Sequence, residues 1–369
     1  LGCEKDYHKA KYYFELSSKQ GGDADAFLYL GSIYEYGLDV DKDISEAIKY
    51  YELAAKQKNS NAIFRLAEIY FGRNSFKKAR EYLELIEKES QPIVMNLLGF
   101  IYQHGCEVKQ DYIKAKGYFE RAAKQNDSNG FLNLGNLYAN GPADMRDYKK
   151  AKEYYELSKN LKNPEAFYQL GNLYMHGNGV TQDNEKAINY YKKAADLNFL
   201  HACLVLGNIY FEGEIVKTNY IEALKYFGKA AEKNNPEAFL NLGFMYCNGL
   251  GVVKSLEEGV RYYTLSAQQN NVVALDNLGI CYLKGAGVEQ NYKKAKYFFE
   301  LAANQKYPSA INNLGNMYLN GDGVKQNYKK AIHYFEEAAN LKSSDAMINL
   351  GIIYLNGMGV TKDYKKARD

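Results

Sequence analysis

The sequence has no tryptophan, and it has only 5 prolines and 5 cysteines among 369 residues. An odd number of cysteines without a Cys-x-x-Cys pair argues against a disulfide framework or a zinc site, and small buried thiols in a reducing compartment are the simpler interpretation. No apolar run approaches the roughly 18 residues that a membrane-spanning helix needs. We therefore expect no metal site and no direct membrane insertion, and a cytoplasmic location.

An excess of one charge is also missing. The 47 basic residues are balanced by 44 acidic ones, which gives a formal net charge of +3. This balance creates no sequence-wide field for nucleic acid or acidic membranes, so we expect no nucleic-acid partner. Apolar residues make up 46% of the chain and aromatic residues 14%, which excludes a disordered protein.

What the sequence has in abundance is an internal repeat. A Leu-Gly pair with a tyrosine three residues after its glycine recurs every 36 residues, apart from one interval of 32. We use this glycine as the reference position of each repeat. The reference residues are Gly31, Ala67, Gly99, Gly135, Gly171, Gly207, Gly243, Gly279, Gly315 and Gly351. A regular period of this length indicates a solenoid of stacked helical units.

Each reference glycine lies in a segment with helical periodicity, which we name helix A. Apolar or small residues occupy positions −5, −4, −1, 0, +2 and +3, which fall on one side of a helix. Four prolines stand seven residues before the reference position, where a helix tolerates proline in its first turn. Glycine inside a helix costs about 1 kcal/mol, so its recurrence predicts the close approach of a second helix.

A second helix, helix B, follows each helix A. A glycine, often within Gly-x-Gly-Val, is placed to end helix A in a left-handed conformation. Helix B then begins at a residue type that favours the N-cap. These N-cap residues are Asp6, Asp43, Ser75, Asp111, Asp147, Asp183, Asn219, Ser255, Asn291, Asn327 and Asp363. The predicted fold is an all-α superhelix, or solenoid, of about ten helix-turn-helix repeats with a 36-residue period.

At these residues the chain resembles the Sel1-like repeat family, a branch of the tetratricopeptide-like α-solenoids. The matching residues of one repeat are Ala166, Leu170-Gly171, Tyr174, Gly177, Gly179-Val180, Lys186-Ala187, Tyr190-Tyr191 and Ala194-Ala195. The resemblance implies a scaffold or adaptor that binds other proteins, without catalytic residues or a cofactor. We interpret residues 1–369 as a single array. We expect a piece of a longer protein, because residues 1–20 correspond to a helix B without its helix A and residues 361–369 to a truncated helix B.

The candidate binding surface is the side of helix A that faces away from the core. It is centred on position +1 and flanked by positions −3, −2, +4 and +5, and we name it the helix-A surface. Asparagines recur at +1 and −2, and a carboxamide can both donate to and accept from a peptide backbone. The candidate partner-binding residues are Asn136, Tyr168, Gln169, Asn172, His176, Asn208, Asn241, Phe244, Asn277, Asn313 and Asn316.

Two alternatives stay open for this surface. The asparagines could instead bond to neighbouring repeats or simply reflect an asparagine-rich composition. Seven of the ten residues at position −3 are apolar or aromatic, which fits either burial between repeats or a groove for an apolar peptide, and we favour burial. The paired lysines at the start of helix B, such as Lys149-Lys150, are predicted to form a solvated face.

We predict a non-catalytic protein-interaction scaffold that docks a peptide or helix of another protein along the helix-A surface. No small-molecule substrate is expected. The alternative is a regulatory or targeting region of a larger enzyme, for example a signalling kinase, whose catalytic domain is not in this chain. Enzymatic activity of the array itself is disfavoured because no nucleophile–base or acid–base constellation stands outside the repeat pattern. The glycine loops also lack the lysine of a phosphate-binding loop.

Overall fold

The computed structural model describes residues 6–20, 22–89 and 91–368, and within them every regular element is helical. The even-numbered α-helices are the helices A: α2 (Ala24–Tyr36), α4 (Ser60–Gly72), α6 (Pro92–His104), α8 (Ser128–Asn140), α10 (Pro164–His176), α12 (Leu200–Glu212), α14 (Pro236–Asn248), α16 (Val272–Lys284), α18 (Pro308–Asn320) and α20 (Ser344–Asn356). The odd-numbered ones are the helices B: α1 (Tyr7–Gln20), α3 (Ile44–Lys56), α5 (Phe76–Leu85), α7 (Tyr112–Ala123), α9 (Tyr148–Asn160), α11 (Asn184–Asp196), α13 (Tyr220–Ala231), α15 (Leu256–Ala267), α17 (Tyr292–Asn304), α19 (Tyr328–Asn340) and α21 (Tyr364–Arg368). A short 3-10 helix, η1 (Glu87–Glu89), follows α5.

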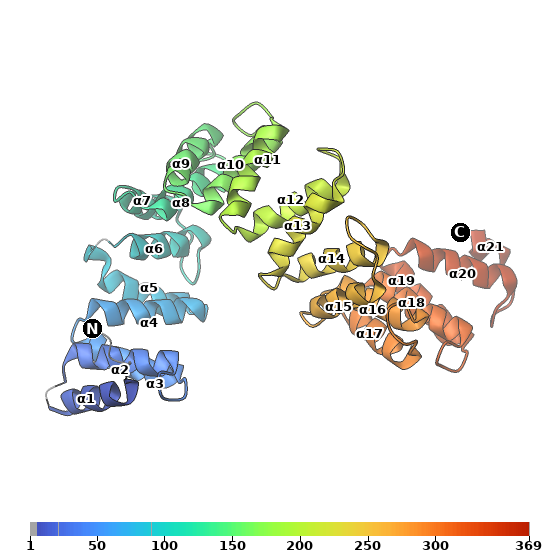
Figure 1. The fold of residues 1–369 in the computed structure, drawn as a ribbon, viewed down its shortest axis with the longest axis horizontal. Coiled ribbons are helices and arrows are strands. Elements are labelled where there is room, and N and C mark those ends of the chain that lie inside the picture. Colours follow the sequence, from blue (N-terminus) through green and yellow to red (C-terminus); the bar gives the residue numbers. More distant parts are fainter. Residues whose placement is uncertain (1–5, 21, 90, 369) are drawn as a thin grey trace. The chain divides into compact units, whose positions relative to one another are not determined.

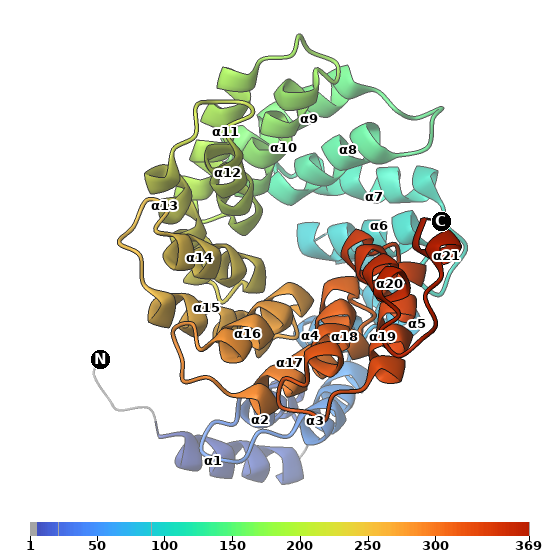
Figure 2. The same ribbon diagram turned by 90° about the vertical axis from the view of Figure 1, so that its right-hand side faces the viewer.

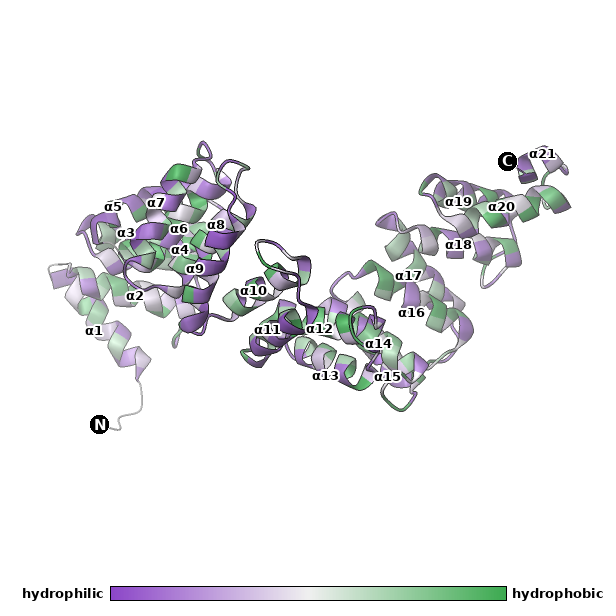
Figure 3. Cartoon of the chain, turned by 90° about the horizontal axis from the view of Figure 1, so that it is seen from above, coloured by the Kyte–Doolittle hydropathy of each residue, from purple (hydrophilic) through white to green (hydrophobic). Residues whose placement is uncertain are grey.

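The chain divides into two compact units, Leu1–Tyr190 (unit 1) and Tyr191–Asp369 (unit 2). Within each unit, helix A packs against helix B of its own repeat, and helix B packs against the helix A that follows (Figure 1). The helices carry both hydrophobic and hydrophilic residues (Figure 3), as expected for elements that bury one side. The terminal segments contain the helices α1 and α21, while residues 1–5 and 369 lie outside the described residues. The prediction that residues 1–369 form a single array across both units stays a prediction.

An aromatic ring of helix B explains the reference glycine. A Cβ atom built on Gly99 would lie 2.3 Å from Cε1 of Phe119, and one on Gly135 would lie 2.5 Å from the ring of Tyr155. Real Cβ atoms do not approach other atoms this closely, so a side chain here would displace the ring. The large aromatic side chains that are fully buried on helices B are Tyr51, Phe119, Tyr155, Tyr191, Phe227, Phe299 and Phe335. The predicted close approach of two helices is confirmed.

The repeat of α4 and α5 follows the same rule with different residues. It has Ala67 at the reference position, and Leu83 replaces the aromatic residue on helix B. Both side chains are fully buried in one cluster. The smaller leucine leaves room for the extra methyl group of alanine, so the packed volume is conserved. The 32-residue interval arises in the short loop between these two helices, not in the helices themselves.

A second aromatic layer lies beside the first. The tyrosine at position +3 stacks on an aromatic residue of helix B, as Tyr138 does on Tyr154 with ring centroids 5.6 Å apart. The lysine before the helix-B alanine lies over this tyrosine, and Nζ of Lys150 is 5.4 Å from the Tyr138 centroid. Lys149 and Lys150 are both exposed, as predicted. Lys150 also makes a cation–π contact, worth about 0.5–1 kcal/mol at an exposed site, which the sequence analysis missed.

Most helix ends follow the predicted signals, but the predicted left-handed glycine is missing after α4, which ends at Arg73 (φ −91°), and after α8, where Gly141 is extended (φ −68°). Glycines with positive φ end the helices A at Gly37, Gly105, Gly177, Gly213, Gly249, Gly285, Gly321 and Gly357. The predicted N-cap residues of the helices B accept backbone N–H groups, as Asp111 does from Lys114 at 2.8 Å. Ser75 makes no such bond, so its predicted capping role is wrong. Glu107, in the next repeat, accepts from the N–H of Lys77 at 2.6 Å and replaces it.

Candidate functional site

The structure places the candidate residues in two groups, one in each unit. Unit 1 holds Asn136 on α8 and Tyr168, Gln169, Asn172 and His176 on α10. Unit 2 holds Asn208 on α12, Asn241 and Phe244 on α14, Asn277 on α16, and Asn313 and Asn316 on α18. Figure 2 shows α12, α14 and α16 in succession within unit 2. Each group is described by itself.

In unit 1 the carboxamides make bonds within the chain. The hydroxyl of Tyr155 donates to Oδ1 of Asn136 at 2.8 Å, and burial raises the pKa of Tyr155. Asn136 therefore accepts the hydrogen bond that the buried hydroxyl-bearing side chain of Tyr155, on α9, needs. Nδ2 of Asn172 donates to Oε1 of Gln169 at 3.0 Å. Of the remaining candidates on α10, Tyr168 is half-buried and His176 is exposed.

Other asparagines join one repeat to the next. Nδ2 of Asn133, at position −2 of α8, donates to Oδ1 of Asn96, at position −3 of α6, at 3.1 Å. Nδ2 of Asn96 in turn donates to the carboxylate of Asp127, the N-cap residue of α8, at 2.7 Å. These bonds hold α6 and α8 in register and correspond to the structural role that the sequence analysis left open for the asparagines.

The same pairing recurs between α16 and α18 in unit 2. The carboxylate of Asp276, at position −3, is only 4% exposed. It accepts from the hydroxyl of Ser309 at 2.7 Å and from Nδ2 of Asn313 at 2.9 Å. Burial raises the pKa of Asp276, while these two hydrogen bonds act in the opposite direction. The carboxamide of the candidate residue Asn313 is therefore committed to a bond between repeats.

Asn316 is engaged in a similar way between α18 and α20. Nδ2 of Asn349 lies 2.9 Å from Oδ1 of Asn312 and 3.3 Å from Oδ1 of Asn316, and it donates to both. Asn312 is buried, so this contact also satisfies a polar group inside the stack. Of the six candidates in unit 2, Asn313 and Asn316 thus serve the stacking of repeats.

Three asparagines of unit 2 differ from these. Asn208, Asn241 and Asn277 are half-buried and make no side-chain hydrogen bond within the described residues. In the part of the chain that the structure describes, the one buried side-chain polar atom without a partner is Nε of Arg80, so the atoms of these three carboxamides are open to solvent. Phe244 lies beside them with 44% of its surface exposed. We name Asn208, Asn241, Phe244 and Asn277 the open stretch.

The favoured burial of the seven apolar residues at position −3 holds only in part, because Leu132 is buried, five are half-buried (Tyr168 among them) and one is exposed. Three residues of this column, Leu132, Asp276 and Asn312, are buried. Four others, Leu28, Phe64, Leu204 and Leu240, are partly buried and pack against core clusters. The exposed residue is Ile348 on α20, at 59%.

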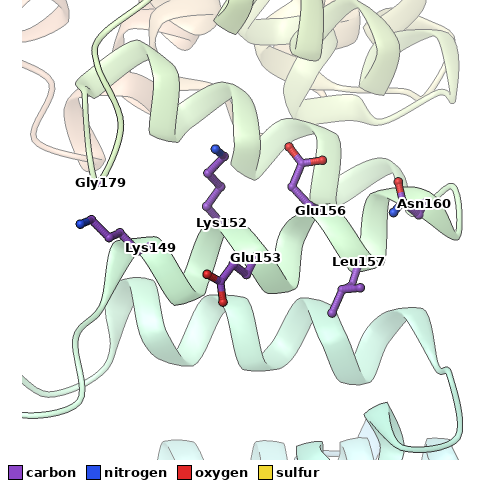
Figure 4. A pocket seen from close by; sticks show the side chains of 7 residues that line it. All are labelled: Lys149, Lys152, Glu153, Glu156, Leu157, Asn160 and Gly179. Atoms are coloured by element: carbon purple, nitrogen blue, oxygen red, sulfur yellow. The ribbon is translucent and has the colours of Figure 1, made fainter.

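A hollow of about 620 Å³ lies on α9, a helix B of unit 1, and is separate from the helix-A surface (Figure 4). Its lining residues are Lys149, Lys152, Glu153, Glu156, Leu157, Asn160 and Gly179. Several of these side chains already serve contacts within or between repeats. Glu156 pairs with Lys159 and accepts from the hydroxyl of Tyr190 at 3.2 Å, and Nζ of Lys152 lies 5.9 Å from the ring centroid of Tyr174. The two lysines and two glutamates of the lining balance each other, so the hollow offers no net charge to a ligand.

Within the described residues, no group of three or more histidine, cysteine, aspartate or glutamate side chains is placed to bind a metal ion. The four cysteines in this part, Cys106, Cys203, Cys247 and Cys281, have free thiols, while Cys3 lies outside the described residues. Burial raises the pKa of Cys281 to about 11, which leaves little reactive thiolate at neutral pH. No described helix has both the length and the apolar character needed to cross a membrane.

Comparison with family sequence patterns identifies the repeat. The pattern of the Sel1 repeat matches residues 1–22, 24–59, 60–86, 92–127, 132–163, 164–199, 200–235, 236–271, 272–307, 308–343 and 344–369. The chain belongs to the Sel1 repeat family. Sel1 repeat proteins generally serve as protein-interaction scaffolds and are typically non-catalytic, in agreement with the expected class of function.

Two solved structures resemble this Sel1 repeat chain over most of its length. One is a protective antigen present in uropathogenic Escherichia coli strains, described as displaying an SLR fold. It is 28% identical, the match covers 97% of this chain and 85% of that chain, and the TM-score is 0.55. The other is a Sel1 repeat protein from Oxalobacter formigenes, with 28% identity, coverage of 78% and 83%, and a TM-score of 0.59. A comparison with curated proteins finds no match.

One residue of the helix-A surface was not among the candidates predicted from the sequence. Phe211, at position +4 of α12, contacts Phe244 of α14 edge to face, with ring centroids 6.0 Å apart. A signal for it existed, because position +4 belongs to the helix-A surface as defined and carries an aromatic residue here. Phe211 extends the apolar part of the open stretch across two repeats.

Proposed function

We propose that this Sel1 repeat chain is a non-catalytic scaffold that binds an extended peptide segment of a partner protein at the open stretch of unit 2. One observation carries the proposal: Asn208, Asn241 and Asn277 keep their carboxamides open to solvent, although asparagines of the same columns elsewhere are paired. Three successive helices A thus offer unused donors and acceptors.

The chemistry of a carboxamide suits this role. Each non-proline residue of an extended peptide has one N–H and one C=O that need partners, and an asparagine side chain can supply both a donor and an acceptor. Such contacts bind the main chain and tolerate many side chains. The exposed edge of Phe244 adds an apolar contact for one peptide side chain. A helical partner fits less well, because its backbone groups are already paired internally.

Tyr168 and His176 stay predicted partner-binding residues of unit 1, which is considered by itself. Asn136, Gln169 and Asn172 are weaker candidates, because binding would have to replace the hydrogen bonds that they make in the free chain. Attachment to a larger enzyme also remains a prediction, and peptide binding is compatible with it.

Selection of peptides from a random dodecapeptide display library on the full chain tests the proposal. Selected peptides should lose most of their affinity for an Asn208→Ala/Asn241→Ala/Asn277→Ala variant. The matched control, Asn160→Ala/Asn304→Ala/Asn340→Ala, changes three exposed asparagines on helices B and should bind like the unmodified chain. Circular dichroism of both variants checks the fold. If the selected peptides bind both variants equally well, the proposed site is wrong.

A further inference from the structure

Exposed lysines gather in unit 2 where the successive helices B α17, α19 and α21 begin (Figure 1). Each of these helices has lysine at the second and third positions after its N-cap, and the loops before α19 and α21 each add one more. These eight exposed residues are Lys293, Lys294, Lys325, Lys329, Lys330, Lys362, Lys365 and Lys366. We name them the lysine edge.

The loops between the helices make this edge continuous. A Cβ atom built on Gly323, in the loop before α19, would overlap Cβ of Tyr292 at the beginning of α17. In the same way, a Cβ atom on Gly359, in the loop before α21, would overlap Cβ of Tyr328 at the beginning of α19. Each loop therefore packs on the start of the preceding helix B, so the lysines of successive repeats lie along one edge.

The lysine edge has little compensating charge. Within the described residues, none of its lysines makes an ion pair. In the same column of unit 1, by contrast, Nζ of Lys150 lies 3.8 Å from the carboxylate of the N-cap residue Asp147. The N-cap residues of α17 and α19 are asparagines, which cap the helix without a charge, as Asn291 does for the N–H of Lys294 at 2.9 Å. The acidic residues of the same loops and N-caps are Glu289, Asp322 and Asp363.

This placement of charge is unfavourable for the helices themselves. The first turn of a helix carries a partial positive charge from the macrodipole, so a glutamate stabilises it and a lysine does not. In α13 and α15, earlier in unit 2, three of the four equivalent positions are glutamate: Glu222, Glu257 and Glu258. Departures from a local rule are expected where a function requires them. The repeated lysines therefore indicate a surface that binds an anionic ligand.

The third-position lysines are held in place by tyrosines of the helices A. Nζ of Lys294 lies 5.0 Å from the ring centroid of Tyr282, and the equivalent lysines of α19 and α21 lie at the same distance from their tyrosines. The ring carries no counter-charge, so each ammonium group stays available for a charge-assisted hydrogen bond to a carboxylate. Side chains that are already ordered lose less conformational freedom when a ligand binds.

The extent of the lysine edge distinguishes between anionic partners. The loop before α17 packs on the start of α15, where a Cβ atom on Gly287 would lie 2.9 Å from the backbone N of Glu257. The edge therefore continues into the glutamates of α15. A nucleic acid has a phosphate at every nucleotide and would meet these glutamates as it runs along the edge, whereas a protein segment can confine its charge to a few residues.

We propose that the lysine edge binds a short acidic segment, rich in aspartate and glutamate, of a partner protein. This surface consists of the starts of the helices B and their loops, so it is separate from the open stretch and does not depend on the proposed function. The ammonium groups bind the carboxylates, because the N-cap residues already occupy the helix N–H groups.

A labelled dodecapeptide of alternating glutamate and serine tests the proposal on the full chain by fluorescence anisotropy. A Lys293→Gln/Lys294→Gln/Lys329→Gln/Lys330→Gln variant should bind it at least about ten-fold more weakly. The matched control, Lys77→Gln/Lys78→Gln/Lys149→Gln/Lys150→Gln, removes the same charge from the same columns of unit 1 and should stay within about two-fold. Circular dichroism checks the fold of both variants.

Salt and the charge of the peptide provide further readouts. Raising the salt from about 0.1 M to about 1 M shortens the Debye length from about 10 Å to about 3 Å and should abolish binding. The same peptide with glutamine in place of glutamate should not bind. Equal losses for the two lysine variants, or an acidic peptide that does not bind the unmodified chain, would overturn the proposal. Tighter lysine-dependent binding of a single-stranded DNA dodecamer than of the peptide would contradict the assigned class of partner.

Discussion

The open stretch of α12–α16 and the paired stretch of α16–α20 use the same columns of helix A differently. Asn313 and Asn349, at position −2, bond to Asp276 and Asn312, which stand 37 residues earlier at position −3. A third pair with this separation joins Asn133 to Asn96. In every one of these pairs the residue at −3 is polar.

The open stretch has leucine at the corresponding positions. Leu204 stands 37 residues before Asn241, and Leu240 stands 37 residues before Asn277. A leucine side chain cannot accept a hydrogen bond, so the carboxamide of the asparagine 37 residues later stays in contact with solvent. Asparagines at −2 are thus paired where the residue at −3 of the preceding repeat is polar and unpaired where it is leucine. The predictions below test this difference.

The largest expected effect concerns the paired stretch. Asp276→Ala should destabilise unit 2 by about 2 kcal/mol, because Ser309 and Asn313 lose a charged acceptor in a buried site. Asn241→Ala, in the open stretch, should change stability by less than about 0.5 kcal/mol. Urea unfolding of both variants measures the difference. Equal destabilisation would remove the distinction between the two stretches.

A smaller effect is expected for the aromatic residue of the open stretch. Phe244→Ala should weaken binding of a selected peptide about ten-fold, because the peptide loses its apolar contact. Phe100 on α6 provides a matched control, since it occupies the same column in unit 1 and is 40% exposed. Phe100→Ala should leave the affinity within about two-fold. Fluorescence anisotropy with a labelled peptide measures both, and similar losses would contradict the assigned site.

A single pairing bond should contribute less. Asn133→Ala removes the donor to Asn96 and should destabilise unit 1 by about 1 kcal/mol. Asn277→Ala has no such bond to lose and should be nearly neutral for stability. Thermal unfolding followed by circular dichroism gives both values. An equal cost for the two substitutions would mean that the hydrogen bond contributes nothing.

The smallest effect is a pH dependence that the paired stretch has and the open stretch lacks. Burial raises the pKa of Asp276 above its ordinary value of 3.8, so the folded chain holds this proton more tightly than the unfolded chain. The contribution of this group to stability is full below pH 3.8 and is lost as pH rises through the folded pKa. Relative to the unmodified chain, Asp276→Asn should remove that decline in urea unfolding measured across this window. Parallel pH profiles for the two proteins would exclude a shifted carboxyl.

The sequence predicted the architecture well because each signal is local or strictly periodic. The reference glycine, the prolines at the helix starts and the glycine C-caps each follow from one helix or one turn. The pairing of Asn313 with Asp276 depends on two helices of different repeats, so the period of 36 does not reveal it. The separation of 37 residues is visible in the sequence only once the packing of neighbouring helices is known. The capping role of Glu107 could not be predicted for the same reason, because Glu107 caps the helix B of the preceding repeat.

The most direct test of the account converts the open stretch into a paired one. A Leu204→Asn/Leu240→Asn variant supplies the acceptors that Asn241 and Asn277 lack, and Leu28→Asn is a control in the same column with arginine, not asparagine, 37 residues later. The quantity to measure is the affinity of a peptide selected on the unmodified chain, with the fold of each variant checked by circular dichroism. We predict roughly ten-fold weaker binding for the double variant and little change for the control. Unchanged affinity of a folded double variant would contradict the claim that the residue at −3 controls the binding surface.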